Sequence, residues 1–324
     1  MKKILILMVA ILAVIVGAAM FLITPDKPLI ELKTKYTTAD SKFAGIEGMQ
    51  VHYRIEGKGD PIVLIHGTGA SLQTWDTWTD SLRKFYKVIR LDMPGFGLTG
   101  PRSDKDYSID MYVHFLHAFM QKLGIDSFAL AGNSLGGQIA WNYALAYPKE
   151  VGALILIDPG GFYNNEKGAL IFKMARVKWI ANALKKMDTK VLVNKTLRDV
   201  YYDDSKITAG TKQLYYDMSM REGNRQAFID RVQQIDKENP KDVRAITCPT
   251  LVLWGKEDQL IDVAMADSFA VIPHAKIIQY KEVGHSPQEE IPAKSVYDAE
   301  EFLQDVKTQN AVETITNALL EGSK

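Results

Sequence analysis

The sequence predicts an α/β fold, in which a mostly parallel sheet carries helices on both faces. Short aliphatic and β-branched runs alternate along the chain with longer segments of helical spacing. The apolar runs are continuous rather than alternating in polarity, which is typical of strands buried on both faces. A first hairpin is closed around Glu47 and Gly48. The expected strands are 42–46, 49–56, 61–65, 87–91, 128–131, 151–157, 250–253 and 276–280.

Helical spacing divides the rest of the chain into core helices and an insertion. The expected core helices are 74–85, 109–123, 135–147, 263–272, 295–306 and a short amphipathic helix, 311–320, that packs on the domain. Residues 160–243 contain no strong strand pattern and read as an inserted helical cap. A cap above the carboxyl ends of the strands would cover the active site and build the substrate pocket. The predicted core is therefore 42–159 together with 244–324.

Composition excludes several classes of protein. The 324 residues include 39 basic and 39 acidic side chains, so nothing in the charge balance favours a nucleic-acid partner. Cys248 is the single cysteine, which rules out an internal disulfide framework and a cysteine-based zinc site. It lies next to Pro249 at the start of an apolar run, where we expect it to be a buried bystander. We expect neither a cofactor nor a metal.

The N-terminus predicts attachment to a membrane. Lys2 and Lys3 precede an apolar run over 4–23, which matches the thickness of a bilayer core. We expect residues 1–24 to be an uncleaved anchor and 25–41 a polar tether, with the catalytic domain periplasmic or extracellular. The alternative is a cleaved signal peptide and a secreted enzyme, but the apolar run is long for that purpose.

The segment 130–137 reads Leu-Ala-Gly-Asn-Ser-Leu-Gly-Gly and predicts a nucleophile elbow. An apolar strand precedes this G-x-S-x-G pattern and a helix follows it. Such a strand-to-helix turn holds a serine in a strained conformation with its hydroxyl exposed. The alternative is a glycine-rich turn with a bystander serine. We predict Ser134 to be a nucleophile.

An acid and a base follow the serine in the expected chain order. Asp258 lies just after the strand 250–253, and His285 lies in the loop after the next strand. Both are therefore expected at the same sheet edge as Ser134. We predict His285 to be the general base and then the general acid, with Asp258 fixing its tautomer. Asp158, which also follows a strand, is the rival acid, whereas the neighbouring Glu257 is expected to face water.

The loop 66–71, His-Gly-Thr-Gly-Ala-Ser, directly follows the strand 61–65 and predicts an oxyanion hole. Two backbone N–H groups can stabilise the negative charge that develops on the substrate oxygen. We expect Leu135 to supply one of them and Thr68 the other.

The first part of the cap is basic. Lysines and arginines there predict either a lid that touches anionic lipid headgroups or an amphipathic helix with a solvated basic face. They are Lys173, Arg176, Lys178, Lys185 and Lys186.

Taken in order, these motifs resemble those of the α/β-hydrolase superfamily over roughly residues 43–306. The motifs are His66-Gly67, the Asp92-Met93-Pro94-Gly95-Phe96-Gly97 segment, the elbow, the Trp254-to-Asp258 segment and Gly284-His285. The resemblance implies an eight-stranded sheet with a cap between its sixth and seventh strands.

The same resemblance narrows the chemistry. Related dehalogenases and epoxide hydrolases use aspartate at the elbow, so Ser134 argues against both. Serine carboxylesterases and lipases remain, together with carbon–carbon hydrolases of ring-cleavage products, which are similar at 132–137 and 158–161. The latter usually carry tryptophan where this chain has Ser286. We predict a small-molecule carboxylic ester as substrate, with carbon–carbon cleavage, perhydrolysis or a non-enzymatic binding role as alternatives.

Overall fold

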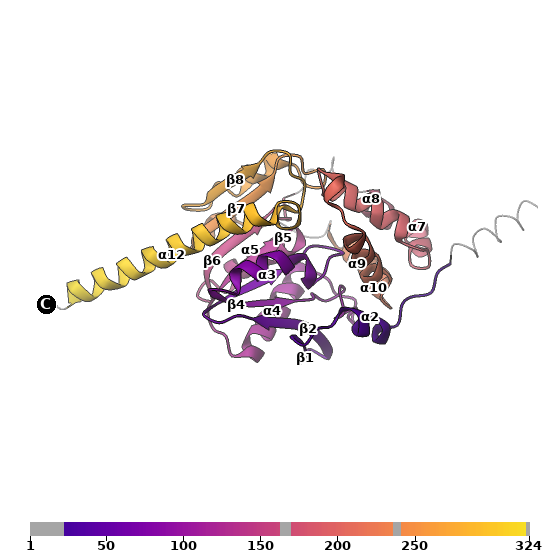
Figure 1. Cartoon of the computed structure of the whole chain (residues 1–324), viewed down its shortest axis with the longest axis horizontal. Coiled ribbons are helices and arrows are strands. Elements are labelled where there is room, and N and C mark those ends of the chain that lie inside the picture. The colour runs from indigo at the N-terminus through magenta and orange to yellow at the C-terminus, as the bar shows by residue number, and fades with distance from the viewer. Residues whose placement is uncertain (1–22, 163–169, 236–240, 322–324) are drawn as a thin grey trace, which may run out of the picture.

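The computed structural model describes residues 23–162, 170–235 and 241–321. Its centre is one eight-stranded sheet with the order β1-β2-β4-β3-β5-β6-β7-β8 (Figure 1). Strand β2 runs antiparallel to both of its neighbours, and β4, β3 and β5 to β8 are mutually parallel. The predicted mostly parallel sheet is confirmed. The strands are Ser41–Ile46, Met49–Glu56, Asp60–Ile65, Tyr86–Leu91, Phe128–Asn133, Val151–Ile157, Thr250–Gly255 and Lys276–Tyr280.

Helices cover both faces of the sheet, so each central strand is buried on both of its faces. Helices α4 (Ile109–Leu123) and α5 (Leu135–Ala146) pack on one face, and α3 (Asp76–Leu82) and the first half of α12 (Pro292–Glu321) pack on the other. In β6, Leu154 and Leu156 point into the first core, whereas Ile155 and Ile157 point into the second. This alternation explains the continuous apolar runs of the sequence.

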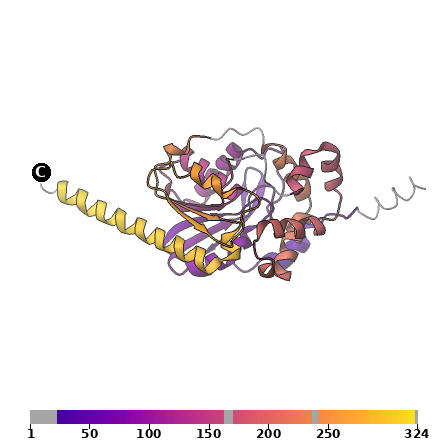
Figure 2. The same ribbon diagram turned by 90° about the horizontal axis from the view of Figure 1, so that it is seen from above.

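The cap lies between β6 and β7. It contains α6 (Leu170–Arg176), α7 (Lys178–Leu184), α8 (Lys190–Val200), α9 (Ala209–Met220) and α10 (Asn224–Val232), with the short turn η2 (Asp204–Lys206). Helices α6, α7, α8 and α10 share a small apolar core of their own. Figures 1 and 2 both place them at one end of the molecule, away from the protruding end of α12.

Two of the expected core helices, 74–85 and 263–272, differ from those of the structure in their type and their bounds. The segment 74–85 begins earlier, as the 3-10 turn η1 (Leu72–Trp75), and continues as α3. The expected helix 263–272 is only the 3-10 turn η5 (Val263–Ser268), capped by the side chain of Asp262. Polar side chains such as those of Asp267 and Ser268 compete with helical backbone hydrogen bonds, which favours the shorter turn.

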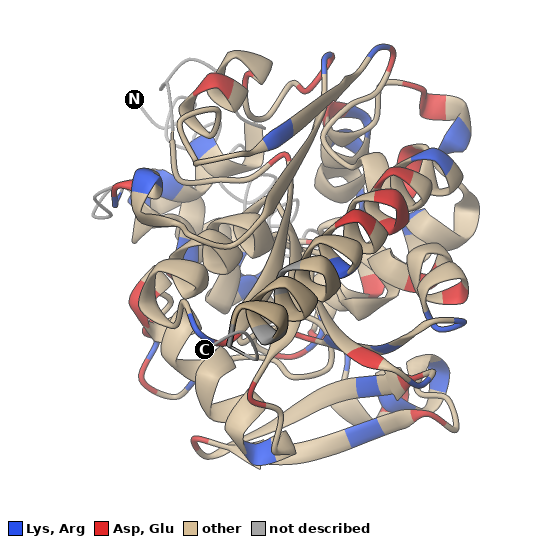
Figure 3. Cartoon of the chain, turned by 90° about the vertical axis from the view of Figure 1, so that its left-hand side faces the viewer, with Lys and Arg blue, Asp and Glu red and all other residues tan. Residues whose placement is uncertain are grey.

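The expected short helix 311–320 does not pack on the domain. It is the end of α12, which runs without interruption because the sequence holds no glycine or proline between residues 293 and 321. Beyond Val306 the helix leaves the core, and Val312, Ile315 and Leu319 are exposed. Seen from the α12 side, the positions of basic and acidic residues are interspersed along the ribbon (Figure 3).

The expected polar tether is instead a strap that is bound to the cap. Residues 24–36, called the strap below, include α2 (Leu29–Tyr36), whose Leu32 is buried against Leu98 and Met218. Buried Asp217 of α9 accepts hydrogen bonds from Lys27, Lys35 and Tyr36 at 2.5–2.6 Å. The segment predicted as a polar tether thus contains a helix and is held against the cap by long-range charge pairing, which no local sequence pattern indicates.

Most of the predicted anchor, residues 1–22, lies outside the described residues. From Ile23 onward, within the described ranges, no helix is long and apolar enough to cross a membrane. Cys248 is buried, as expected, and burial raises the pKa of its thiol to about 11.

Replacing Asp217 with Asn should loosen the strap. Burial alone would raise the pKa of Asp217, but hydrogen bonds from Lys27, Lys35, Tyr36 and Gln213 lower it to about 2. A depressed pKa stabilises the fold above the unfolded-state value and loses that effect as pH falls. We expect D217N to lower the free energy of unfolding by about 2 kcal/mol at pH 7. The difference from the wild type should shrink between about pH 4 and 2.

Urea unfolding over this pH range measures the difference. The control is D204N, because Asp204 makes only an exposed 3.7 Å ion pair with Arg198, worth less than about 1 kcal/mol. Equal effects of the two substitutions would contradict the stabilising role of the strap.

Candidate active site

The turn between β5 and α5 has the geometry of a nucleophile elbow. Ser134 has φ 56° and ψ −117°, a strained conformation for a residue with a side chain. A Cβ on Gly132 would lie 2.2 Å from the carbonyl oxygen of Gly136, and one on Gly136 would lie 2.2 Å from that of Ile65. The glycines are therefore required for the close approach of strand, turn and helix.

The loop after β3 lies directly against this elbow. A Cβ on Gly67 would lie 3.0 Å from Cβ of Ser134. Among the described groups, the backbone N–H groups of Thr68 and Leu135 donate no hydrogen bond, so both are available to a ligand. His66 holds the loop in place. Its Nδ1 bonds the carbonyl of Gly67 at 2.8 Å, its Nε2 accepts from the N–H of Met93, and burial lowers its pKa.

His285 and Asp258 form a buried pair. Nδ1 of His285 lies 2.7 Å from Oδ2 of Asp258, and the other oxygen of Asp258 accepts the N–H groups of Leu260 and Ile261 at 2.7 and 3.0 Å. The carboxylate is thus held by the loop that follows β7 and orients the imidazole. Ser134 and His285 line the same cavity, without a direct hydrogen bond between them in the described structure. Such contacts often tighten only when substrate binds.

The rival acid, Asp158, occupies a different place in this cluster. One of its oxygens accepts the N–H of Gly255 at 3.0 Å, and its carboxyl group lies beside that of Asp258. Complete burial and the neighbouring charge of Asp258 raise the pKa of Asp158 well above its usual range. The raised pKa favours the protonated form of Asp158, and the imidazole pairs with Asp258 and not with Asp158.

Asp158, Asp258 and His285 also have the composition of a metal site, because their ligand atoms lie within 4.8 Å of one another. The oxygens of Asp258 are already used by two N–H groups and by His285, however. A neutral Asp158 is a poor ligand as well. The cluster fits a proton-transfer site better than a cation site.

Two further side chains hold the histidine loop, and the sequence patterns did not single out either of them for this. Nδ2 of Asn133 donates to the backbone carbonyl of His285 at 3.0 Å. Glu290 accepts the N–H of Gly284 at 2.7 Å and those of Tyr202 and Asp203 in the cap. Glu290 thereby joins the cap to the loop that carries the base. The signal available in the sequence was a glutamate five residues after His285.

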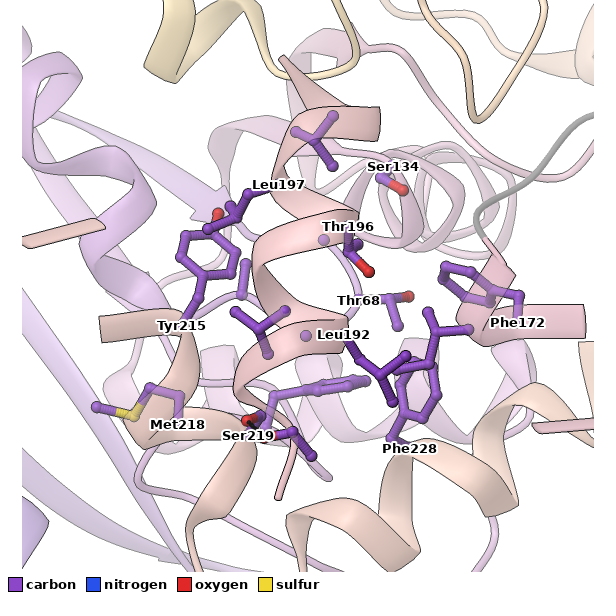
Figure 4. Close-up of a pocket in the computed structure, with 18 of the residues that line it drawn as sticks. Thr68, Ser134, Phe172, Leu192, Thr196, Leu197, Tyr215, Met218, Ser219 and Phe228 are labelled. Carbon is purple, nitrogen blue, oxygen red and sulfur yellow. Dashed lines mark hydrogen bonds between the residues drawn. The ribbon is translucent and has the colours of Figure 1, made fainter. Parts of the chain in front are cut away.

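An apolar cavity lies between the elbow and the cap. Thr68 and Ser134 lie on its core side, and cap helices such as α8, α9 and α10 supply the other side (Figure 4). His285 also lines the cavity, and α6 and α7 contribute further cap residues. The cap residues are mainly aliphatic and aromatic: Ile171, Phe172, Leu184, Leu192, Val193, Leu197, Val200, Tyr215, Met218, Phe228 and Ile229. Of the five site residues predicted from sequence, Ser134, Thr68 and His285 line the cavity, Asp258 supports His285, and Leu135 begins α5 next to the serine.

A second serine, histidine and aspartate are connected elsewhere in the core. Nδ1 of His52 lies 2.7 Å from Asp92, and its Nε2 lies 3.0 Å from Oγ of Ser41. Neither Ser41 nor His52 lines the apolar cavity, and Phe43 stacks on the imidazole. This arrangement joins β1, β2 and the loop after β4, as expected for a structural histidine.

Glu257, expected to face water, is half-buried and accepts the N–H of Val283.

The chain belongs to the α/β-hydrolase fold family, whose model matches residues 60–292. It is similar to Lipase 3 of Moraxella sp. (strain TA144), with 29% identity over 77% of this chain and 79% of the relative. It is also similar to 2-hydroxy-6-oxo-6-(2'-aminophenyl)hexa-2,4-dienoic acid hydrolase of Metapseudomonas resinovorans, with 28% identity over 72% of this chain and 83% of the relative.

A solved structure of a membrane phospholipase A superposes with a TM-score of 0.72 and 25% identity, covering 95% of this chain and 99% of that one. Together with the family match, these relatives establish that the protein is an enzyme, a hydrolase, with lipase-like and carbon–carbon hydrolase similarity.

Substitution of the two carboxyl groups should separate their roles. Asp258→Asn would favour the wrong histidine tautomer, and we expect kcat to fall on the order of 10⁴-fold. Asp158→Asn keeps a neutral group that can donate to Asp258, so we expect kcat to fall by less than about tenfold. Steady-state hydrolysis of a p-nitrophenyl ester measures both. If D158N were the more damaging change, Asp158 would be the orienting acid.

Proposed function

We propose that the protein hydrolyses carboxylic esters through an acyl-enzyme on Ser134. The observation that carries this proposal is the apolar cavity above the serine, with a buried histidine–aspartate pair at its base. A cavity lined by aliphatic and aromatic side chains suits an acyl chain, because burial of apolar surface stabilises the bound substrate. The similarity to a lipase and a phospholipase A supports the same class of substrate.

The proposed reaction has two steps. His285 removes the proton of the Ser134 hydroxyl as its oxygen attacks the ester carbonyl, and the N–H groups of Thr68 and Leu135 stabilise the oxyanion. His285 then protonates the leaving alcohol, and an acyl group remains on Ser134. Water, activated by His285, releases the acid and regenerates the serine. Asp258 keeps Nδ1 of the imidazole protonated and stabilises its positive charge.

Carbon–carbon cleavage of ring-fission products is the second candidate, favoured by the similarity to the dienoic acid hydrolase. A substrate of that kind is a carboxylate and would need a cation in the cavity. Among the described lining residues, Arg225 is the only lysine or arginine. Its guanidinium already donates to Asp26 and to the carbonyls of Thr24 and Met187. This engagement favours a neutral ester over an anionic substrate, and perhydrolysis remains a weaker alternative on the same residues.

Replacement of Ser134 with alanine should remove the nucleophile and leave the fold intact. We expect kcat on p-nitrophenyl esters to fall on the order of 10⁶-fold. The melting temperature should not fall, because the change removes only a hydroxyl and leaves the Cβ and the backbone turn as they are. A mutant with normal ester turnover would refute the assignment of Ser134.

A substrate series should distinguish the two candidate reactions. We expect turnover of p-nitrophenyl esters to rise from acetyl to medium acyl chains, as the chain fills the apolar cavity. A vinylogous 1,5-diketone acid, measured beside the esters, should react far more slowly. Faster cleavage of the diketone than of every ester would favour the carbon–carbon hydrolase.

We also propose that residues 1–24 anchor the protein in a membrane, with the catalytic domain outside the cytoplasm. The apolar run over 4–23 and the similarity of almost the whole chain to a membrane phospholipase A support this proposal. We expect the full-length protein to stay in the membrane fraction after salt and carbonate washes. Release of a shortened form by cells would instead support the alternative of a cleaved signal peptide and a secreted enzyme.

A further inference from the structure

The end of the apolar N-terminal run is fixed against the cap. The N–H of Thr24 donates to the carbonyl of Lys186 at 2.8 Å, and Ile23 forms a β-bridge with Met187. Arg225 of α10 donates to the carbonyl of Thr24 and to Asp26. The chain therefore leaves its predicted anchor directly onto the loop between α7 and α8. An anchor at 1–24 would bring this side of the cap to the bilayer surface.

The side of the cap formed by residues 170–191, called the cap face below, is both basic and apolar. It holds six lysines and arginines and one acid, Asp188, whose carboxylate is bound to Tyr216. Trp179 is 75% exposed, and Val191 is 78% exposed. Exposed tryptophan beside lysines is typical of surfaces at the headgroup level of a bilayer. The basic residues are Lys173, Arg176, Lys178, Lys185, Lys186 and Lys190.

The cap face also borders the substrate cavity. On α6, exposed Leu170 precedes Ile171, which lines the cavity, and on α8, exposed Val191 precedes Leu192, which does the same. Both lining residues are half-buried, and each adjoins an exposed apolar residue, so the wall of the cavity lies next to the cap face. A lipid lying under the cap face would be next to the wall of the cavity.

We propose that the cap face docks on an anionic lipid bilayer, with Trp179 at the headgroup level and the lysines facing lipid phosphates. The strap sets the orientation, and docking presents membrane-borne esters to the cavity. This inference rests on the proposed anchor and ester hydrolysis, and it names the lipid surface as the place where substrate is taken up. The basic and the apolar residues of the cap face act together, since positive charge attracts anionic headgroups and apolar side chains enter the interface.

Trp179 is a built-in reporter of this contact. The other four tryptophans, Trp75, Trp78, Trp141 and Trp254, are at most 1% exposed. We would reconstitute the full-length protein in vesicles of phosphatidylcholine and phosphatidylglycerol, with or without brominated acyl chains, which quench nearby indoles. We expect bromination to reduce tryptophan emission in the wild type and to leave that of W179F unchanged. Equal emission of the wild type in both vesicles would overturn the proposal.

The lysines are tested by a matched pair of triple variants. K178Q/K186Q/K190Q removes three of the six basic charges of the cap face, and K58Q/K149Q/K276Q removes three exposed lysines at the starts of strands, at the opposite edge of the sheet. We expect K178Q/K186Q/K190Q to hydrolyse a phospholipid ester in anionic vesicles about tenfold more slowly than the wild type. We expect K58Q/K149Q/K276Q to match the wild type in the same vesicles. Both variants should hydrolyse soluble p-nitrophenyl butyrate at the wild-type rate.

The two assays separate the possible failures. Equal vesicle rates of the two triple variants would overturn docking by the cap face. Failure of the wild type to hydrolyse the soluble ester would instead refute the proposed reaction. The quenching of Trp179 would still decide whether the cap face contacts lipid.

Discussion

The strained turn at Ser134 is the constraint on which the site depends. The serine can adopt its left-handed conformation only because Gly132 and Gly136 allow two backbones to approach within distances that any Cβ would prevent. The same turn starts α5, leaves the N–H of Leu135 without a partner among the described residues and places Ser134 against the loop of Thr68. A small change of backbone there would therefore disturb the nucleophile and the oxyanion donors together.

The two neighbouring buried carboxyl groups, Asp158 and Asp258, have different roles. Two adjacent buried charges would repel each other strongly, so one proton is retained, and the pKa of Asp158 is the one that is raised. Asp258 accepts two backbone N–H groups and pairs with the imidazole. Asp158, whose pKa is raised, then acts as a positioning residue beside it. Glu290 and Asn133 add a second layer, because they hold the loop of His285 against the cap and the elbow.

The sequence predicts local features of this protein better than distant ones. Continuous apolar runs located six of the strands, the turn at Glu47 and Gly48 located the first hairpin, and the glycine pattern located the elbow, because all three depend on neighbouring residues. The strap depends on Asp217 meeting lysines about 180 residues away, a pairing that no local pattern announces. Likewise, helix propensity predicted a helix at 311–320 but could not say that it extends α12 into solvent. The relation of Asp158 to Asp258 required knowledge of which strands are neighbours in the sheet.

The most direct test of the central claim is rapid acid quenching of the enzyme during turnover of a p-nitrophenyl ester, followed by mass spectrometry of its peptides. The proposed mechanism predicts a burst of p-nitrophenol and an acyl group attached to the peptide that contains Ser134. Acylation of another residue, or turnover without any acylated peptide, would contradict it.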